Sequence, residues 1–121
     1  MTSKDSIFVC GSTNIPAVSF QRKGAFKTEV RDLIDERHGS RRCALRLFSI
    51  EKGGHTPVDR HDYEHAMYVL KGQGILRKEL GEESLRNGDV AFIPSNAIHQ
   101  FINENDEPLV YVLINVFTRE P

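Results

Sequence analysis

The 121-residue sequence has no tryptophan, only two cysteines and no long apolar run. No window approaches the eighteen apolar residues that a membrane-spanning helix needs, and the N-terminus has only a short apolar patch with an acid close by. We therefore expect a cytoplasmic protein that makes no membrane contact. Cys10 and Cys43 share no motif spacing with each other or with the histidines, so we expect reduced, structural cysteines, with a disulfide between them as the alternative.

The sequence also lacks a surplus of positive charge. Lys and Arg total 16 against 17 Asp and Glu, which gives a net charge of -1. A nucleic-acid-binding protein needs clustered Lys and Arg to neutralise phosphates. We therefore expect no nucleic-acid partner, and we consider a small-molecule substrate or ligand instead.

Short runs rich in β-branched and aromatic residues are separated by glycine, proline, Asn and Asp. They are "CALRLFSI", "AMYVL", "GILRKEL", "DVAFIP", "IHQFIN" and "LVYVLINVF". This spacing predicts an all-β sandwich or barrel, and the length is that of one domain. The segment "EVRDLIDERHGS" fits either a helical turn or two strands joined by a hairpin, and we favour strands. We expect an N-terminal arm over residues 1–24 and a single barrel domain over 25–121.

The segment "VDRHDYEH", residues 58–65, carries several possible metal ligands. In a strand, Asp59 and His61 would face the same side, and a returning antiparallel strand could bring His65 beside them. His99 lies far along the chain, at the head of another apolar run. Imidazole and carboxylate are the usual ligands of Zn, Mn, Fe and Ni. The candidate metal ligands are therefore Asp59, His61, His65 and His99.

Two other interpretations apply to the histidine pair alone. A lone pair such as His61 and His65 is more often a polar surface feature than a metal site. On a helix, the same i, i+4 pair could bind zinc, but the zinc-protease pattern requires Glu directly after the first His, where this chain has Asp62. The β-rich run "MYVL" that follows also favours a strand over a helix.

The spacing of these residues resembles the two motifs of the cupin family, G-x5-H-x-H-x3,4-E-x6-G and G-x5-P-x-G-x2-H-x3-N. The first spacing is followed by Gly53, Asp59, His61, His65 and Gly72, and the second by Gly88, Pro94, Asn96, His99 and Asn103. The resemblance covers roughly residues 42–117 and is to small single-domain bacterial cupins of the cupin 2 type. It implies a double-stranded β-helix, the jelly-roll barrel of two antiparallel sheets, and a homodimer.

Three positions depart from that pattern. Asp59 replaces the usual first His, His65 the usual Glu, and Asn96 the usual Gly, although Asn tolerates left-handed backbone angles. His65 makes the chain similar to a manganese-binding subgroup that reads H-x-H-x-W-E-H and uses four histidines. The resemblance implies one divalent transition metal, with Mn, Fe or Ni favoured and Zn or Cu possible.

The Asp at position 59 leaves the ligand set open. A carboxylate reaches less far from the backbone than an imidazole, so Asp59 could bind a metal directly, bind through water or not bind. One or two coordination positions stay open in each case, as a substrate or dioxygen requires.

Further residues are candidates for the wall of a pocket beside the metal. Arg46 lies within an apolar run, so it either occupies a solvated face or lines a pocket that takes an anionic group. The other candidate pocket residues are Tyr63, Met67, Phe101 and Tyr111.

The resemblance fixes a site and not a reaction. We expect a metal-dependent enzyme of the oxygenase type that acts on a small organic molecule, because no separate acid–base pair stands out and the metal would have to perform the chemistry. The alternatives are a non-catalytic ligand-binding or sensory cupin and a metal-dependent isomerase or lyase.

Overall fold

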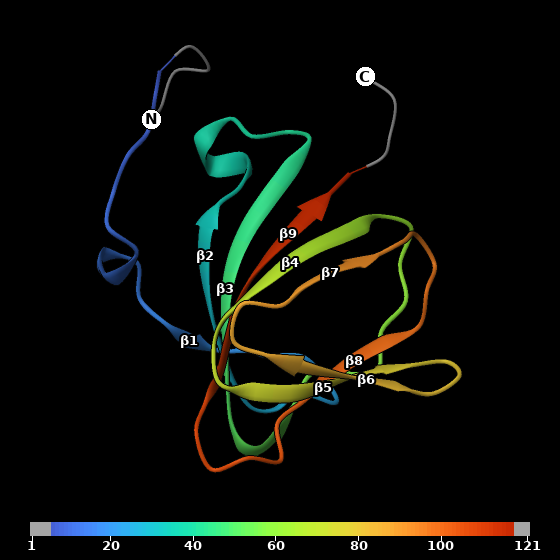
Figure 1. Ribbon diagram of the computed structural model, residues 1–121. Coiled ribbons are helices and arrows are strands. Elements are labelled where there is room, and N and C mark those ends of the chain that lie inside the picture. Colours follow the sequence, from blue (N-terminus) through green and yellow to red (C-terminus); the bar gives the residue numbers. More distant parts are fainter. Residues whose placement is uncertain (1–5, 118–121) are drawn as a thin grey trace.

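Nine β-strands make up most of the regular structure in this computed structural model, which describes residues 6–117 (Figure 1). They are β1 (Val18–Ser19), β2 (Phe26–Ile34), β3 (Cys43–His55), β4 (Glu64–Lys71), β5 (Gln73–Lys78), β6 (Glu82–Arg86), β7 (Val90–Ile93), β8 (His99–Ile102) and β9 (Leu109–Val116). Two single 3-10 turns, η1 (Ser12–Asn14) and η2 (Glu36–His38), complete the set. None of the helical turns in this part of the chain has the length or apolar character needed to cross a membrane.

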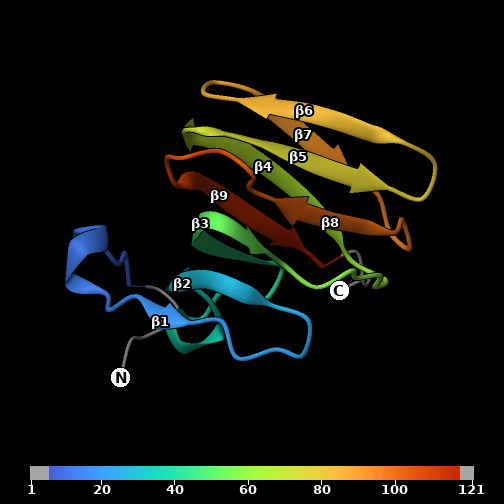
Figure 2. The same cartoon turned by 90° about the horizontal axis from the view of Figure 1, so that it is seen from below.

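The strands follow the order β6-β5-β8-β3-β9-β4-β7, with β2 added to β3 and β1 added to β2, and all pairs are antiparallel. Figures 1 and 2 show β5, β6 and β8 as one layer and β2, β3, β9 and β4 as the other. The long strand β3 joins the two layers, because its last residue, His55, pairs with Ile102 of β8. The expected all-β jelly-roll fold is confirmed.

Strand β9 alternates strictly between buried and partly exposed residues, as a strand with one face on a core must. Its inner face carries Leu109, Tyr111, Leu113 and Asn115. Two of these four side chains are polar. The strand that closes the core therefore also delivers a phenol and an amide into the interior of the barrel.

Two tight turns fix where β4 and β8 lie. Gly72 follows β4 with φ of 88°, and a Cβ there would come within 2.2 Å of the Pro108 carbonyl oxygen, so only glycine fits. Asn96 precedes β8 with φ of 68°, which confirms the expected left-handed conformation. These turns hold the two strands that carry His65 and His99.

The first segment of the barrel differs slightly from its prediction. Strand β2 is present, but its connection to β3 contains η2, whose first turn is capped by the Asp35 carboxylate through the Arg37 N–H at 3.0 Å. The arm ends in β1, which pairs with β2. Residues 1–5 of the expected arm and 118–121 of the expected barrel lie outside the described residues, and the arm–barrel boundary stays a prediction. Cys10 and Cys43 are exposed free thiols.

Candidate metal centre

Three histidines from separate parts of the fold converge at one end of the barrel. His61 lies in the β3–β4 connection, His65 in β4 and His99 at the start of β8. One nitrogen of each lies within 4.8 Å of the others. Their rings meet at 86°, 73° and 87°, so three imidazole edges surround a common centre. Nitrogens that bind one metal at about 2.1 Å lie roughly 3.0–3.4 Å from one another. A small movement of the three imidazole rings toward their common centre would bring their nitrogens to that spacing.

Backbone carbonyls fix the orientation of two rings. His61 Nδ1 lies 2.9 Å from the Tyr63 carbonyl oxygen, and His99 Nδ1 lies 2.8 Å from that of Ala97. A carbonyl can only accept, so each Nδ1 donates and, in the neutral ring, leaves a lone pair on Nε2. The Tyr63 ring also stacks on His61 with 3.7 Å between centroids. Both lone pairs are thereby held ready for a cation.

The hydrogen bonds of the third ring, His65, indicate whether this site fits a metal. Its Nε2 lies 2.9 Å from His61 Nε2, and its Nδ1 is buried without a partner among the described residues. Asn115, opposite His65 in the β4–β9 register, has a buried Oδ1 that makes no hydrogen bond of standard geometry within residues 6–117, although the Asn115 side chain is close enough to raise the His65 pKa as a hydrogen-bond partner. Moving the His65 proton to Nδ1 would give Asn115 a donor and turn a lone pair toward the centre. The tautomer that satisfies both buried atoms is the one that a metal requires.

The electrostatic environment keeps the His65 and His99 rings neutral. Burial lowers the pKa of His65 to about 4, and the neighbouring His61 and His99 add to the effect. Burial also lowers the pKa of His99. Imidazole binds a metal only when it is deprotonated. A pair of buried, neutral histidines is therefore ready to ligate at neutral pH without first losing protons.

Asp59 occupies the fourth motif position, but its carboxylate is turned toward other partners. Oδ2 accepts a hydrogen bond from Arg22 Nη1 at 2.7 Å, and Oδ1 accepts one from the Arg60 N–H at 2.9 Å. Although burial acts to raise the pKa of Asp59, these hydrogen bonds bring it below its usual value. The backbone of Asp59 pairs with His99 in an isolated bridge.

The expected strand through Asp59 and His61 is therefore not formed. Only Asp59 makes a bridge, and residues 60–63 are irregular. Pro57 has no N–H to donate, and this segment crosses between the two layers of the barrel. Consequently strand alternation does not place the two side chains on one face, and the three histidines come together without the carboxylate.

A small cavity of about 40 Å³ adjoins the histidines. Four of the predicted pocket residues line it, namely Arg46, Tyr63, Phe101 and Tyr111, whereas Met67 packs in the core. Six more lining residues were not predicted: Phe20, Arg22, Phe48, Thr56, Pro57 and Leu113. Phe20 and Arg22 come from an arm with no hydrophobic period, so no sequence signal pointed to them.

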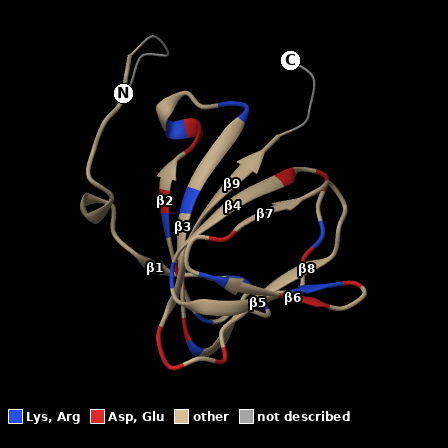
Figure 3. Cartoon of the chain, in the orientation of Figure 1, with Lys and Arg blue, Asp and Glu red and all other residues tan. Residues whose placement is uncertain are grey.

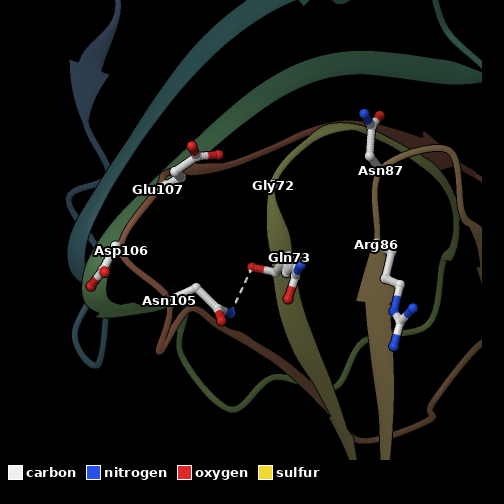
Figure 4. A pocket seen from close by; sticks show the side chains of 7 residues that line it. All are labelled: Gly72, Gln73, Arg86, Asn87, Asn105, Asp106 and Glu107. Atoms are coloured by element: carbon white, nitrogen blue, oxygen red, sulfur yellow. Dashed lines mark hydrogen bonds between the residues drawn. The ribbon is translucent and has the colours of Figure 1, made fainter.

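A larger groove of about 460 Å³ lies at the opposite end of β4, beyond Gly72 (Figure 4). Asn105 Nδ2 donates to the Gln73 carbonyl oxygen across it at 3.3 Å. Acidic residues gather in the adjoining β8–β9 connection (Figure 3), and one of them, Asp106, pairs with Lys52 at 2.8 Å. Because its polar residues are solvated and none is a histidine or cysteine, this groove is a poorer candidate than the smaller cavity.

Comparison with curated proteins finds relatives of several kinds. The chain is 31% identical over 78 residues to 1-methylthio-D-xylulose 5-phosphate methylsulfurylase of Rhodospirillum rubrum, covering 64% of this chain and 50% of that protein. It is 29% identical over 119 residues to auxin-binding protein T85 of Nicotiana tabacum, covering 90% of this chain and 62% of that protein. The chain thus spans only about half to three-fifths of these two relatives.

Solved structures and a family model agree on the fold. The polyketide cyclase RemF from Streptomyces resistomycificus superposes with a TM-score of 0.87 at 28% identity, covering 96% of this chain and 83% of that one. A predicted oxalate decarboxylase from Thermotoga maritima gives 0.81 at 19% identity, covering 91% of this chain and 99% of that one. The model of the cupin domain matches residues 46–115, more than half of the sequence. This chain therefore belongs to the cupin family.

Proposed function

We propose that this cupin is a metal-dependent enzyme of the oxygenase type that acts on a small organic molecule at an open coordination position. The observation that supports it best is the convergence of three imidazoles while Asp59 is held by Arg22. Three protein ligands leave room for a substrate and for dioxygen around one ion. Mn, Fe or Ni suits such a site best, and Zn or Cu is compatible with the same ligands.

Different residues would hold the ion, position its ligands and exclude water. His61, His65 and His99 would hold the ion, which when bound supplies Lewis-acid chemistry and, for a redox-active metal, electron transfer. Tyr63 keeps the His61 ring in place by stacking on it. Buried apolar side chains, including Phe48, Phe101 and Leu113, limit the entry of water.

A second candidate is a metal-assisted isomerisation, lyase reaction or ring closure that needs no oxygen. The similarity to the polyketide cyclase RemF favours it, because the match extends over 96% of this chain. The same three histidines would serve, with the metal acting only as a Lewis acid.

A third candidate is ligand binding without turnover. The similarity to auxin-binding protein T85, which covers 90% of this chain, favours this function. In that case the cavity would hold the head group of a small molecule, and any sensory role would depend on a partner protein.

The three candidates predict different products. The protein is reconstituted separately with Fe²⁺, Mn²⁺, Ni²⁺ and Zn²⁺ and incubated with a panel of small hydroxy acids, keto acids and 1,3-diketones. Oxygen uptake and products are measured in air and under nitrogen, with His99→Ala as the control. Conversion only in air supports the oxygenase, conversion under both atmospheres supports the second candidate, and binding without conversion supports the third.

Membership of the four-histidine manganese subgroup stays a prediction, since Asp59 occupies its first ligand position. The cytoplasmic location, the homodimer and the absence of nucleic-acid and membrane partners are likewise proposals. Light scattering on the purified protein tests the dimer, and cell fractionation tests the location.

A further inference from the structure

One polar atom in the cavity wall has no role in holding the histidines. Tyr111 is fully buried, and its hydroxyl has no hydrogen-bond partner among the described residues. Its ring is held firmly, with Phe48 stacked at 5.4 Å and Phe101 at 4.7 Å between centroids. A buried hydroxyl without a partner is costly, so a native protein that keeps one usually has a use for it.

Arg46 lines the same cavity from β3. Its Nε donates to Asp32 Oδ1 at 2.7 Å, while its terminal nitrogens make no hydrogen bond within residues 6–117. The guanidinium carbon lies 5.4 Å from the centre of the Phe20 ring and 5.2 Å from that of Phe48. These contacts fix the guanidinium plane while leaving its two terminal NH2 groups available to a ligand.

Arg46 and Tyr111 act on the same part of the cavity. Arg46 pairs with Leu113 and Phe48 pairs with Tyr111 in the β3–β9 register, so Arg46 and Tyr111 are diagonal neighbours on one face of the sheet. Burial raises the pKa of Tyr111 well above its usual value. The hydroxyl thus stays protonated and can donate. The guanidinium and the phenol therefore line the same cavity beside the histidines, and both groups can donate hydrogen bonds.

The surrounding charges favour an anion in that space. Arg22 is neutralised by Asp59, and Arg46 is paired with Asp32. If the three neutral histidines hold a divalent ion, as proposed above, its double positive charge has no counterpart among these pairs. This step rests on the proposed function. An anionic ligand would supply the missing charge.

We infer that Arg46 and Tyr111 form a carboxylate-binding subsite, and that the substrate or ligand of this protein is a small organic acid. Its carboxylate accepts hydrogen bonds from the Arg46 terminal nitrogens and the Tyr111 hydroxyl, while another part of the molecule reaches the metal position. The guanidinium fork pairs with carboxylates and phosphates alike, so the small volume of the cavity is what favours a carboxylate over a larger tetrahedral anion. The cavity of about 40 Å³ has the space that one or two water molecules occupy, so only the head group fits inside.

The test uses cobalt-loaded protein titrated with acetate, with neutral acetamide as its isostere and inorganic phosphate as a tetrahedral anion. Binding is followed by calorimetry and by the visible spectrum of the cobalt. The variants are Arg46→Gln and Tyr111→Phe. Their matched controls are Arg77→Gln, which removes an exposed arginine of β5, and Tyr68→Phe, which changes an exposed tyrosine of β4.

We expect acetate to bind at least about tenfold more tightly than acetamide or phosphate. Arg46→Gln should weaken acetate binding by about tenfold or more and Tyr111→Phe by about fivefold, with cobalt still bound at one ion per chain. The control variants should match the wild type. Equal binding of acetate and acetamide, tighter binding of phosphate, or unchanged affinity in both site variants would overturn the inference.

The inference and the proposed function fail in different ways. If the wild-type protein takes up no cobalt, the proposed metal site is wrong. The calorimetric titration is then repeated on the metal-free protein. Acetate binding that depends on Arg46 and Tyr111 would still support the subsite, and acetate binding that is absent or indifferent to them would overturn it.

Discussion

Arg22 Nη1 lies 2.7 Å from Asp59 Oδ2, so a residue of the N-terminal segment holds the carboxylate at the position where most cupins have their first histidine ligand. The pair is partly exposed, with side-chain exposures of 48% for Arg22 and 23% for Asp59. Arg22 and Asp59 both line the cavity beside the histidines, and the paired carboxylate is not one of the three groups that could share an ion. The protein's metal chemistry should therefore depend on three imidazoles and only indirectly on Asp59.

Asp59→Asn should leave one metal ion per chain, with affinity lowered less than about tenfold, because an amide at this position loses a charge near the ion but no direct bond. Equilibrium dialysis against a competing chelator measures the affinity. Arg22→Gln is the companion variant, since it releases the carboxylate and should strengthen binding. A loss of metal from Asp59→Asn as large as that from His99→Ala would show that Asp59 is a ligand.

Asn115→Ala should weaken metal binding by about 10- to 100-fold, which is typical for the loss of a group that orients a ligating histidine. Asn115 lies opposite His65, and its Oδ1 is the neighbouring atom that can accept a hydrogen bond from His65 Nδ1. The same dialysis measures the change. Asn105→Ala removes an amide from the groove at the far end of the barrel and should bind metal as the wild type does; equal losses in both variants would contradict the role of Asn115.

The stability of the metal-free protein should fall as the pH drops from about 6.5 toward 4. The pKa of His65 is about 4 in the folded chain and about 6.5 when unfolded, so the unfolded chain binds more protons in that window. The free energy of unfolding therefore rises with pH there, by about 3 kcal/mol for this residue. Urea unfolding of chelated protein between pH 4.5 and 7 measures the slope.

His65→Gln should remove most of that slope, while His55→Gln, which changes a histidine outside the cluster, should keep it. The lowered pKa of His99 acts in the same direction, so some slope remains in His65→Gln. A wild-type stability that is flat across this window would show that His65 is not buried in its neutral form.

Tyr111→Phe should stabilise the ligand-free protein, because it removes a buried hydroxyl that has no hydrogen-bond partner in the described part of the chain. The penalty of such a group is about 1–3 kcal/mol, and the free energy of unfolding should rise by a comparable amount. Thermal unfolding without acetate measures it, with Tyr68→Phe as the control. A clear loss of stability would mean that the hydroxyl is satisfied in the folded protein and is not reserved for a ligand.

The fold was largely predictable because most strands carry their own signal. The six apolar runs correspond to β3, β4, β5, β7, β8 and β9. Strand β6 was missed because "EESLR" has a single apolar residue, Leu85, on its buried face. Backbone pairing with β5 in a hairpin determines where β6 lies. Such pairing cannot be recognised from the hydrophobic periodicity of the sequence.

The site was predictable only in part. Motif spacing brought His61, His65 and His99 together correctly, since those turns and strand lengths fix where each side chain lies. The partner of Asp59 was not predictable, because Arg22 is 37 residues away in a segment without a period. Long-range pairing of two charged side chains leaves no local pattern for a single sequence to show.

The metal content of untagged protein, measured by mass spectrometry after purification and again after chelation and reloading, tests the central claim most directly. We predict one divalent transition-metal ion per chain in the wild type and in Asp59→Asn, and a near-complete loss in His61→Ala and His99→Ala. A wild-type protein that stays metal-free after reloading, or His99→Ala protein that retains a full ion per chain, would contradict it.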